Sequence, residues 1–338
     1  MGIRSAVAAL FALSILAPTH AGADDTRHAY RIEARLDAER HLVSGTARIV
    51  WTNESEAAAS ELWLHLYMNA FENRETVFMR ESRGQLRGVT FLSPGSIRLS
   101  ALRIAGEDHL RTADDEVIAR DRTQLRVPLL APVPPGASIE LEVSFETALP
   151  TAFARAGYVD DFHMVAQWFP KLARLERDGQ WATFPYHGLG EFYADFALYD
   201  VTLDLPSEHV VGATGVEVET VRHGDRTTHR FVAERVHDFA FASDPDFKIR
   251  VQDCSGTKVR VLAPPGFDRT ALRSLRITCE GLEYLGRLYG PYPYPALTVV
   301  VPPRGASGAA GMEYPTLFTT DGGHFTIPFL HSGGVDDT

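Results

Sequence analysis

The residues 304–320 (R-G-A-S-G-A-A-G-M-E-Y-P-T-L-F-T-T) join a glycine- and alanine-rich run to a single carboxylate, Glu313. Small residues allow a backbone or a ligand to approach closely, and an acid among them can meet a positive charge on that ligand. The positions after the acid that alternate as in a strand are Tyr314, Thr316, Phe318 and Thr320. The stretch therefore predicts a substrate groove with one anionic anchor.

The segment 311–315 (G-M-E-Y-P) resembles the G-x-M-E-N element of zinc aminopeptidases related to aminopeptidase N. In that family the strand edge pairs with the substrate backbone, and the glutamate binds the free α-amino group. The resemblance implies that Glu313 binds a substrate amine, with Met312 and Gly311 beside it in the substrate-binding element. Without the resemblance, an acid at a strand edge is more simply explained by pairing with an arginine or facing water.

Further segments resemble, in order along the chain, the amino-terminal β-domain of the same family. They are residues 166–172 (A-Q-W-F-P-K-L), 181–185, 190–200 and 201–215. The first of them lines the first substrate pocket in the family, where typical members carry Q-x-E with both polar side chains facing the bound amine. The resemblance places Gln167 at the first position, whereas Phe169 stands where the glutamate is usual. Glu313 is therefore expected to have less help in holding an ammonium group.

The resemblance also implies a zinc cofactor, but the ligands for it are missing from the chain. A thermolysin-like enzyme needs H-E-x-x-H on a helix, because histidines four apart can share one metal while the glutamate acts on its water. None of the 13 histidines is followed by glutamate, and no two of them stand four apart. In the family the zinc helix follows the region that resembles residues 328–334. We therefore expect zinc ligands beyond Thr338, no catalytic or metal-binding residue within the chain, and no activity of the chain alone.

No other chemistry competes with this interpretation. His324 and His331 stand among glycines near the end of the chain and are more simply explained as solvated loop residues than as a metal pair. The sequence has no nucleophile elbow with a Ser-His-Asp pattern, no P-loop and no dinucleotide-binding glycine motif. Lys and Arg number 33 against 44 Asp and Glu, for a net charge of −11, and no basic cluster interrupts this balance. A nucleic-acid partner is therefore not expected.

Short segments of two-residue periodicity predict a mainly β fold, in which residues 24–247 form an antiparallel β-sandwich (saddle-like) domain. Residues 30–51 read as an opening hairpin, and Leu62, Leu64 and Leu66 mark a strand in which His65 is a polar position rather than a ligand. The further expected strands are 97–104, 124–129, 138–146, 196–205, 217–221, 228–233 and 239–243. The aromatic-rich segment 157–190 is explained equally well as a functional segment and as an aromatic core under a loop.

The pattern changes after about Lys248. Residues 259–262 and 297–301 read as strands, and an amphipathic helix is expected from Arg269 to Tyr289, with Asp268 as its cap and Gly290 at its end. Its apolar positions are Leu272, Leu275, Cys279, Leu282, Leu285 and Tyr289. Together with the strand of Glu313, this order resembles the α+β start of a thermolysin-like catalytic domain, which is expected over residues 248–338.

Residues 1–23 combine Arg4, an apolar run and small residues before Asp24, which predicts a signal peptide cleaved after Ala23. The apolar run is too short to span a bilayer. The chain is therefore expected to be periplasmic or secreted, with no membrane span. Cys254 and Cys279 could pair in an oxidising compartment, but a buried free thiol at Cys279 is equally natural on a helix stripe.

Two hypotheses of different classes remain from the sequence. The first is the amino-terminal part of an exported zinc aminopeptidase acting on peptides, with the substrate amine at Glu313. The second is a non-catalytic module, related to such enzymes, that binds a peptide or a partner protein. The sequence indicates no particular oligomeric state and no side-chain preference.

Overall fold

The computed structural model describes residues 27–86, 89–111, 113–115 and 121–320. Strands make up 48% and helices 13%, which confirms the predicted mainly β fold. The predicted signal peptide, His324, His331 and the rest of residues 321–338 lie outside the described residues. None of the described helices is both long enough and apolar enough to cross a membrane.

The largest sheet has eight strands in the order β16-β17-β14-β1-β2-β10-β6-β7, and β1 and β14 are its parallel pair. Its strands are β1 (Ala29–Asp37), β2 (Leu42–Thr52), β6 (Ser96–Ile104), β7 (Glu107–Asp108), β10 (Ser138–Ala148), β14 (Ala197–Pro206), β16 (Val216–His223) and β17 (Arg226–Val236). The predicted opening hairpin is confirmed, because β1 and β2 pair antiparallel and alternate residues of β1 are buried.

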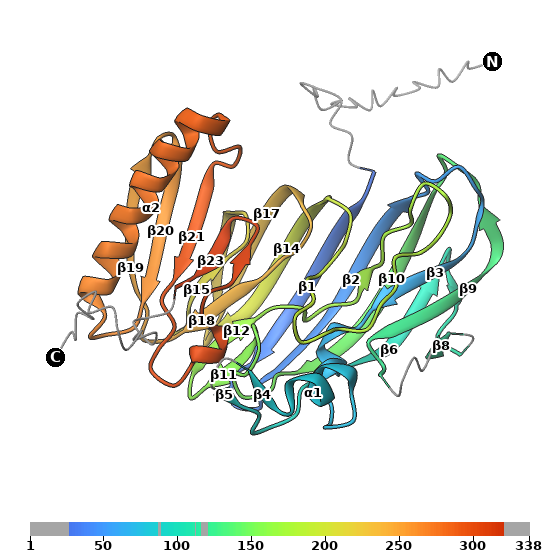
Figure 1. Ribbon diagram of the computed structural model, residues 1–338, viewed down its shortest axis with the longest axis horizontal. Coiled ribbons are helices and arrows are strands. Elements are labelled where there is room, and N and C mark those ends of the chain that lie inside the picture. Colours follow the sequence, from blue (N-terminus) through green and yellow to red (C-terminus); the bar gives the residue numbers. More distant parts are fainter. Residues whose placement is uncertain (1–26, 87–88, 112, 116–120, 321–338) are drawn as a thin grey trace, which may run out of the picture.

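Smaller sheets lie in front of the large one in the view of Figure 1. One contains β11 (Gly157–Val159), β12 (Phe162–Val165), β18 (Phe241–Asp244) and β15 (Val210–Ala213). A second contains β13 (Lys171–Leu172), β3 (Ala59–His65), β9 (Gln124–Val133) and β8 (Asp114–Asp115), and a third pairs β4 (Gln85–Leu86) with β5 (Val89–Thr90). The 3₁₀ helix η1 (Tyr67–Phe71) and the short helix α1 (Val77–Ser82) follow β3. Side chains from β1, β2, β3, β9, β12 and β18 meet in one core.

A five-stranded sheet forms the other end of the molecule, in the order β19-β20-β21-β23-β22 (Figure 1). It consists of β19 (Lys248–Cys254), β20 (Thr257–Ala263), β21 (Ala296–Val300), β22 (Glu313–Tyr314) and β23 (Leu317–Thr319). Val261 and Val299 pack in a small core with helix α2 (Asp268–Tyr289), whereas Leu262 and Val300 belong to the main core. One face of the sheet therefore packs against α2 in the small core, and the opposite face packs in the main core. The division into domains near residue 248 stays a prediction.

Helix α2 packs through part of the predicted stripe, because Leu275, Cys279 and Leu282 lie against the small core. Its buried residues are Ala271 and Leu275, with Cys279 and Leu282 packed beside them. Leu272, Leu285 and Tyr289 of the predicted stripe are exposed. The reason is that Leu272 lies one position after Ala271, a rotation of about 100° around the helix. The predicted cap is also wrong, since Phe267 occupies the N-cap position and Asp268 is the first helical residue.

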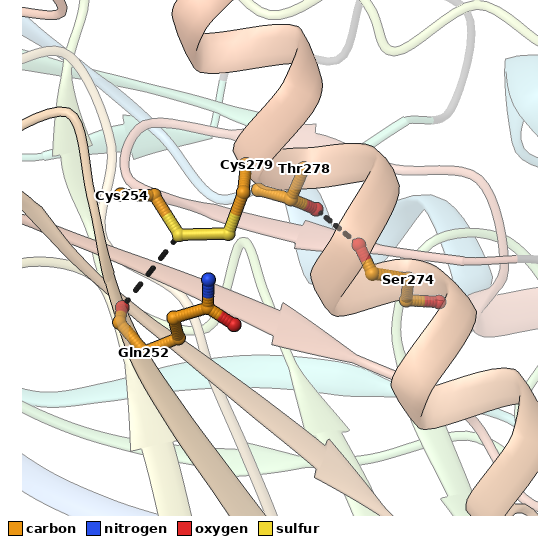
Figure 2. The surroundings of a disulfide bond; sticks show 5 residues. All are labelled: Gln252, Cys254, Ser274, Thr278 and Cys279. Atoms are coloured by element: carbon orange, nitrogen blue, oxygen red, sulfur yellow. Dashed lines mark hydrogen bonds between the residues drawn. A yellow bond between two sulfur atoms is a disulfide. The ribbon is translucent and has the colours of Figure 1, made fainter.

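Cys254 and Cys279 form a disulfide that joins the end of β19 to the middle of α2 (Figure 2). The Sγ atom of Cys254 also lies 3.8 Å from the carbonyl oxygen of Gln252. Because no residue of α2 after Leu275 is buried, the second half of the helix is held by the disulfide and by the partial packing of Leu282. The structure thus selects the bridge from the alternatives that the sequence left open.

Replacing both cysteines with serine should lower the free energy of unfolding by about 3 kcal/mol, as expected when a cross-link closing a loop of this size is lost. Hydrogen exchange should speed up most in the second half of α2, which then keeps only weak packing. Urea unfolding and exchange mass spectrometry test this, with the chemically reduced protein as the matched control. Unchanged exchange in α2 would contradict the assignment of the disulfide as its anchor.

Candidate functional site

Glu313 lies on β22, the outermost strand of the five-stranded sheet. The alternation predicted for Tyr314, Thr316, Phe318 and Thr320 does not form one strand, because the chain reverses between β22 and β23 and forms a hairpin. The reversal is made by Pro315, which favours turns, and by Thr316, whose φ of 58° is left-handed. Thr316 is fixed there: its hydroxyl oxygen accepts a bond from the Gly215 amide at 2.7 Å, and its carbonyl accepts one from the Thr298 amide at 2.8 Å.

The glycine-rich run before β22 approaches another part of the chain's own backbone. A Cβ atom on Gly308 would lie 2.5 Å from the carbonyl oxygen of Phe153, so only glycine fits there. The amide of Arg155 donates to the carbonyl of Gly308 at 2.8 Å, and the hydroxyl of Thr319 donates to the carbonyl of Ala309 at 2.7 Å. The small residues therefore allow the 3₁₀ turn η2 (Ser307–Ala309) to dock against residues 152–155.

The three predicted residues of the 311–313 element have different surroundings. Gly311 has a φ of 66°, which glycine adopts without strain, and Met312 is buried with its amide donating to the Thr319 hydroxyl at 3.0 Å. The side chain of Glu313 is exposed, and no described residue forms a hydrogen bond or an ion pair with it. The element thus holds Glu313 on a rigid base and presents its carboxylate to solvent.

Arg155 contacts β22 through its backbone, since its carbonyl accepts a bond from the Tyr314 hydroxyl at 3.3 Å. Its guanidinium donates two bonds to Glu191, at 2.9 and 2.8 Å, and lies over the ring of Phe192. Burial opposes the charge of this guanidinium, but the hydrogen bonds to Glu191 together with the charges of Tyr186, Glu191 and Tyr314 raise the pKa of Arg155. The positive charge of Arg155 is therefore already paired with Glu191.

Gln167, the other predicted substrate-binding residue, points into the protein interior. It is 4% exposed and has a left-handed φ of 55°. Its carboxamide nitrogen donates to Asp238, and its oxygen accepts a bond from the ammonium of Lys171 at 3.2 Å. The structure therefore does not bring the carboxamide of Gln167 to the surface beside Glu313. Phe169 is buried as well, against the ring of Trp168.

Gln167, Lys171 and Asp238 form a buried polar cluster. The sequence analysis did not identify Lys171 and Asp238 as members of it. Their charged groups lie 2.7 Å apart, and the two side chains are 1% and 3% exposed. The available signal was the charge at Lys171 within the apolar segment A-Q-W-F-P-K-L. Burial, followed by the charge of Asp238, raises the pKa of Tyr314 well above its usual value. The charge of Asp238 is therefore felt at the buried hydroxyl of Tyr314, the residue after Glu313.

One group of described side chains has the composition of a metal site: His28, Glu54 and Asp195. The Nε2 atom of His28 lies 3.3 Å from Glu54 and 3.9 Å from Asp195. However, the Thr52 amide donates to Nδ1 of His28, so the proton of this imidazole is on Nε2, where a metal would have to bind. Both carboxylates are also paired with arginines. The group fits a hydrogen-bonded ion cluster and does not fit zinc.

Neither a protein-family model nor a curated protein sequence matches this chain. The relationship to zinc aminopeptidases accordingly stays a prediction that rests on the resemblance of residues 166–215 and 311–315.

Proposed function

We propose that the chain forms the amino-terminal part of an exported zinc-dependent aminopeptidase and that its own contribution is to hold the amino end of a peptide. The observation that supports this most directly is the exposed carboxylate of Glu313 on an edge strand, with no partner among the described residues. An edge strand offers backbone donors and acceptors to an extended peptide, and a carboxylate accepts strong hydrogen bonds from an ammonium group. Bond cleavage would need zinc ligands, which we expect beyond Thr338.

The charges around β22 favour a cationic ligand over an anionic one. Arg155 is neutralised by two hydrogen bonds to Glu191, so it does not compensate Glu313. Tyr314 is buried and donates its hydroxyl hydrogen to the Arg155 carbonyl. The charge of Glu313 is therefore available to an incoming α-amine, while the backbone of β22 sets the direction of the peptide.

Replacing Glu313 with glutamine should weaken the binding of a peptide with a free amino end by roughly 10- to 100-fold, the usual value of one hydrogen bond to a charged group. Glutamine keeps the size and an acceptor oxygen but removes the charge. Titration calorimetry with an apolar tetrapeptide measures the change. Glu234→Gln, at an exposed position on β17 in the other large sheet, is the matched control and should bind as the wild type does.

If Glu313→Gln and Glu234→Gln bind the peptide with a free amino end equally well, Glu313 is not part of the binding site. A peptide that binds with the expected dependence on Glu313 would support both the enzyme and a non-catalytic peptide-binding module. The mass of the naturally exported protein separates these two. A mass well above the 37.3 kDa of this chain, together with zinc and amino-acid release, supports the enzyme. A mass no larger than that of this chain, with no amino-acid release, supports the binding module.

A further inference from the structure

The ammonium group of Lys171 is enclosed by the kinds of groups that recognise amines. Its Nζ atom lies 2.7 Å from a carboxylate oxygen of Asp238 and 3.2 Å from the carboxamide oxygen of Gln167. The rings of Phe169 and Phe192 complete the enclosure, with centroids 5.6 and 5.9 Å from Nζ. A carboxylate, an amide oxygen and aromatic faces together form an ammonium-binding site.

This arrangement is not explained by stability alone. A buried ion pair contributes little net stability compared with apolar residues of the same size, because both charges lose their hydration. Burial accordingly lowers the pKa of Lys171, although Asp238 acts in the opposite direction. The side chain of Asp238 is also fixed by the amide of its neighbour Phe239, which donates to it at 2.8 Å. The site is therefore rigid and oriented toward the ammonium that occupies it.

We propose that Lys171 is the resident ligand of an internal ammonium-binding site and that it keeps Gln167 and Asp238 occupied. As far as it concerns substrate, this inference rests on the proposed function of Glu313. Gln167 cannot turn its carboxamide toward an incoming ligand without breaking its bonds to both Lys171 and Asp238. The groove then recognises an incoming amine through Glu313 alone. Peptides with a blocked amino end therefore also belong to the substrate class, because blocking the amine removes only its contact with Glu313.

The internal site can be tested without any peptide. Lys171→Ala removes three methylene groups and the ammonium, which leaves a space of the size of n-propylammonium. This ion should raise the Tm of Lys171→Ala by several degrees more than it raises that of the wild type, and n-propanol should not do so. If the variant does not fold unaided, recovery of native circular dichroism on refolding with the ion is the measure.

The matched control is Lys171→Met/Asp238→Leu, which fills the site with apolar groups and should not respond to the ion. An ion-specific rescue of Lys171→Ala alone supports the proposal. Equal effects of the ion on the variant, the wild type and the double variant would overturn it, as would equal rescue by propanol. The effects of the ion and of propanol are both measured as shifts in Tm, with thermal unfolding monitored by circular dichroism.

The consequence for the groove is tested with one peptide in two forms, with a free and with an acetylated amino end. The wild type should prefer the free form by roughly 10- to 100-fold, and Glu313→Gln should bind both forms alike, with a ratio near one. A preference for the free form that persists in Glu313→Gln would reveal a second amine ligand and overturn the inference. Binding of neither form by the wild type would refute the proposed function instead, and the rescue of Lys171→Ala would then decide the internal site.

Discussion

Replacing Asp238 with alanine should lower the free energy of unfolding by about 3–5 kcal/mol, the usual result of leaving one charge of a buried pair without its partner. The ammonium of Lys171 is 1% exposed, so water cannot replace the lost carboxylate. Gln167 loses the acceptor of its carboxamide at the same time. Its left-handed backbone then has less to hold it, and the turn between β12 and β13 should loosen.

The comparison that isolates the charge is a second substitution at Lys171. Lys171→Met in the Asp238→Leu background removes both charges and should recover most of the lost stability, because the desolvation cost disappears with them. Glu140→Ala serves as the control for an exposed pair, since Glu140 is bonded to Arg48 on the sheet surface and its loss should cost far less than that of Asp238. Urea unfolding measures all of these variants. An effect of Asp238→Ala as small as that of Glu140→Ala would mean that Lys171 reaches water in solution.

For strands with one buried face, the sequence predicts which side chains are buried. For strands with two buried faces, it predicts the strand but not the burial of the second face. Alternation in β1 matches its structure because only Tyr30, Ile32, Ala34 and Leu36 face the core. In β3 the leucines also alternate, but Trp63 and His65 on the other side are buried too. Period-two patterning does not reveal the second layer that covers them. His65 therefore lies in an environment that the sequence does not indicate.

The local part of the candidate site could be predicted, but its surroundings could not. Gly311, Met312 and Glu313 are adjacent in sequence, so their sharing one element follows directly from the chain. The turn at Thr316 depends on tertiary hydrogen bonds from Gly215 and Thr298, which override the unfavourable left-handed backbone of a β-branched residue. The orientation of Gln167 similarly depends on Asp238, which is distant in sequence. Contacts of this kind leave no periodic signal.

Two fully buried histidines should make the protein less stable below neutral pH. Burial lowers the pKa of His65 to about 3, helped by the nearby charge of Lys171. Burial also lowers the pKa of His163 to about 3, with further contributions from His41 and His209. The Nδ1 atom of His163 donates to the carbonyl of Asp161 at 2.9 Å, so its Nε2 accepts from His41 at 3.0 Å. A second proton on Nε2 of His163 would therefore face the nitrogen of His41 that donates to it.

The sign of the effect follows from proton uptake on unfolding. An unfolded histidine has a pKa near 6.5, so the unfolded chain binds more protons than the folded one between about pH 6.5 and pH 3. The stabilisation is complete above pH 6.5 and is lost as the pH falls. At pH 5 each of the two residues should cost about 2 kcal/mol relative to pH 7. His41 and His209, whose pKa values burial also lowers, act in the same direction.

Urea unfolding between pH 7 and pH 5 measures this loss as a slope of stability against pH. His65→Phe keeps an aromatic ring against Tyr67 but cannot take up a proton, so its slope should be smaller than that of the wild type by nearly one proton. His223→Gln, at an exposed position on β16, is the control for losing an imidazole. Buried carboxyl groups such as Asp121, whose pKa burial raises, oppose the trend but are common to both variants. The same slope in His65→Phe and His223→Gln would show that His65 takes up no proton on unfolding.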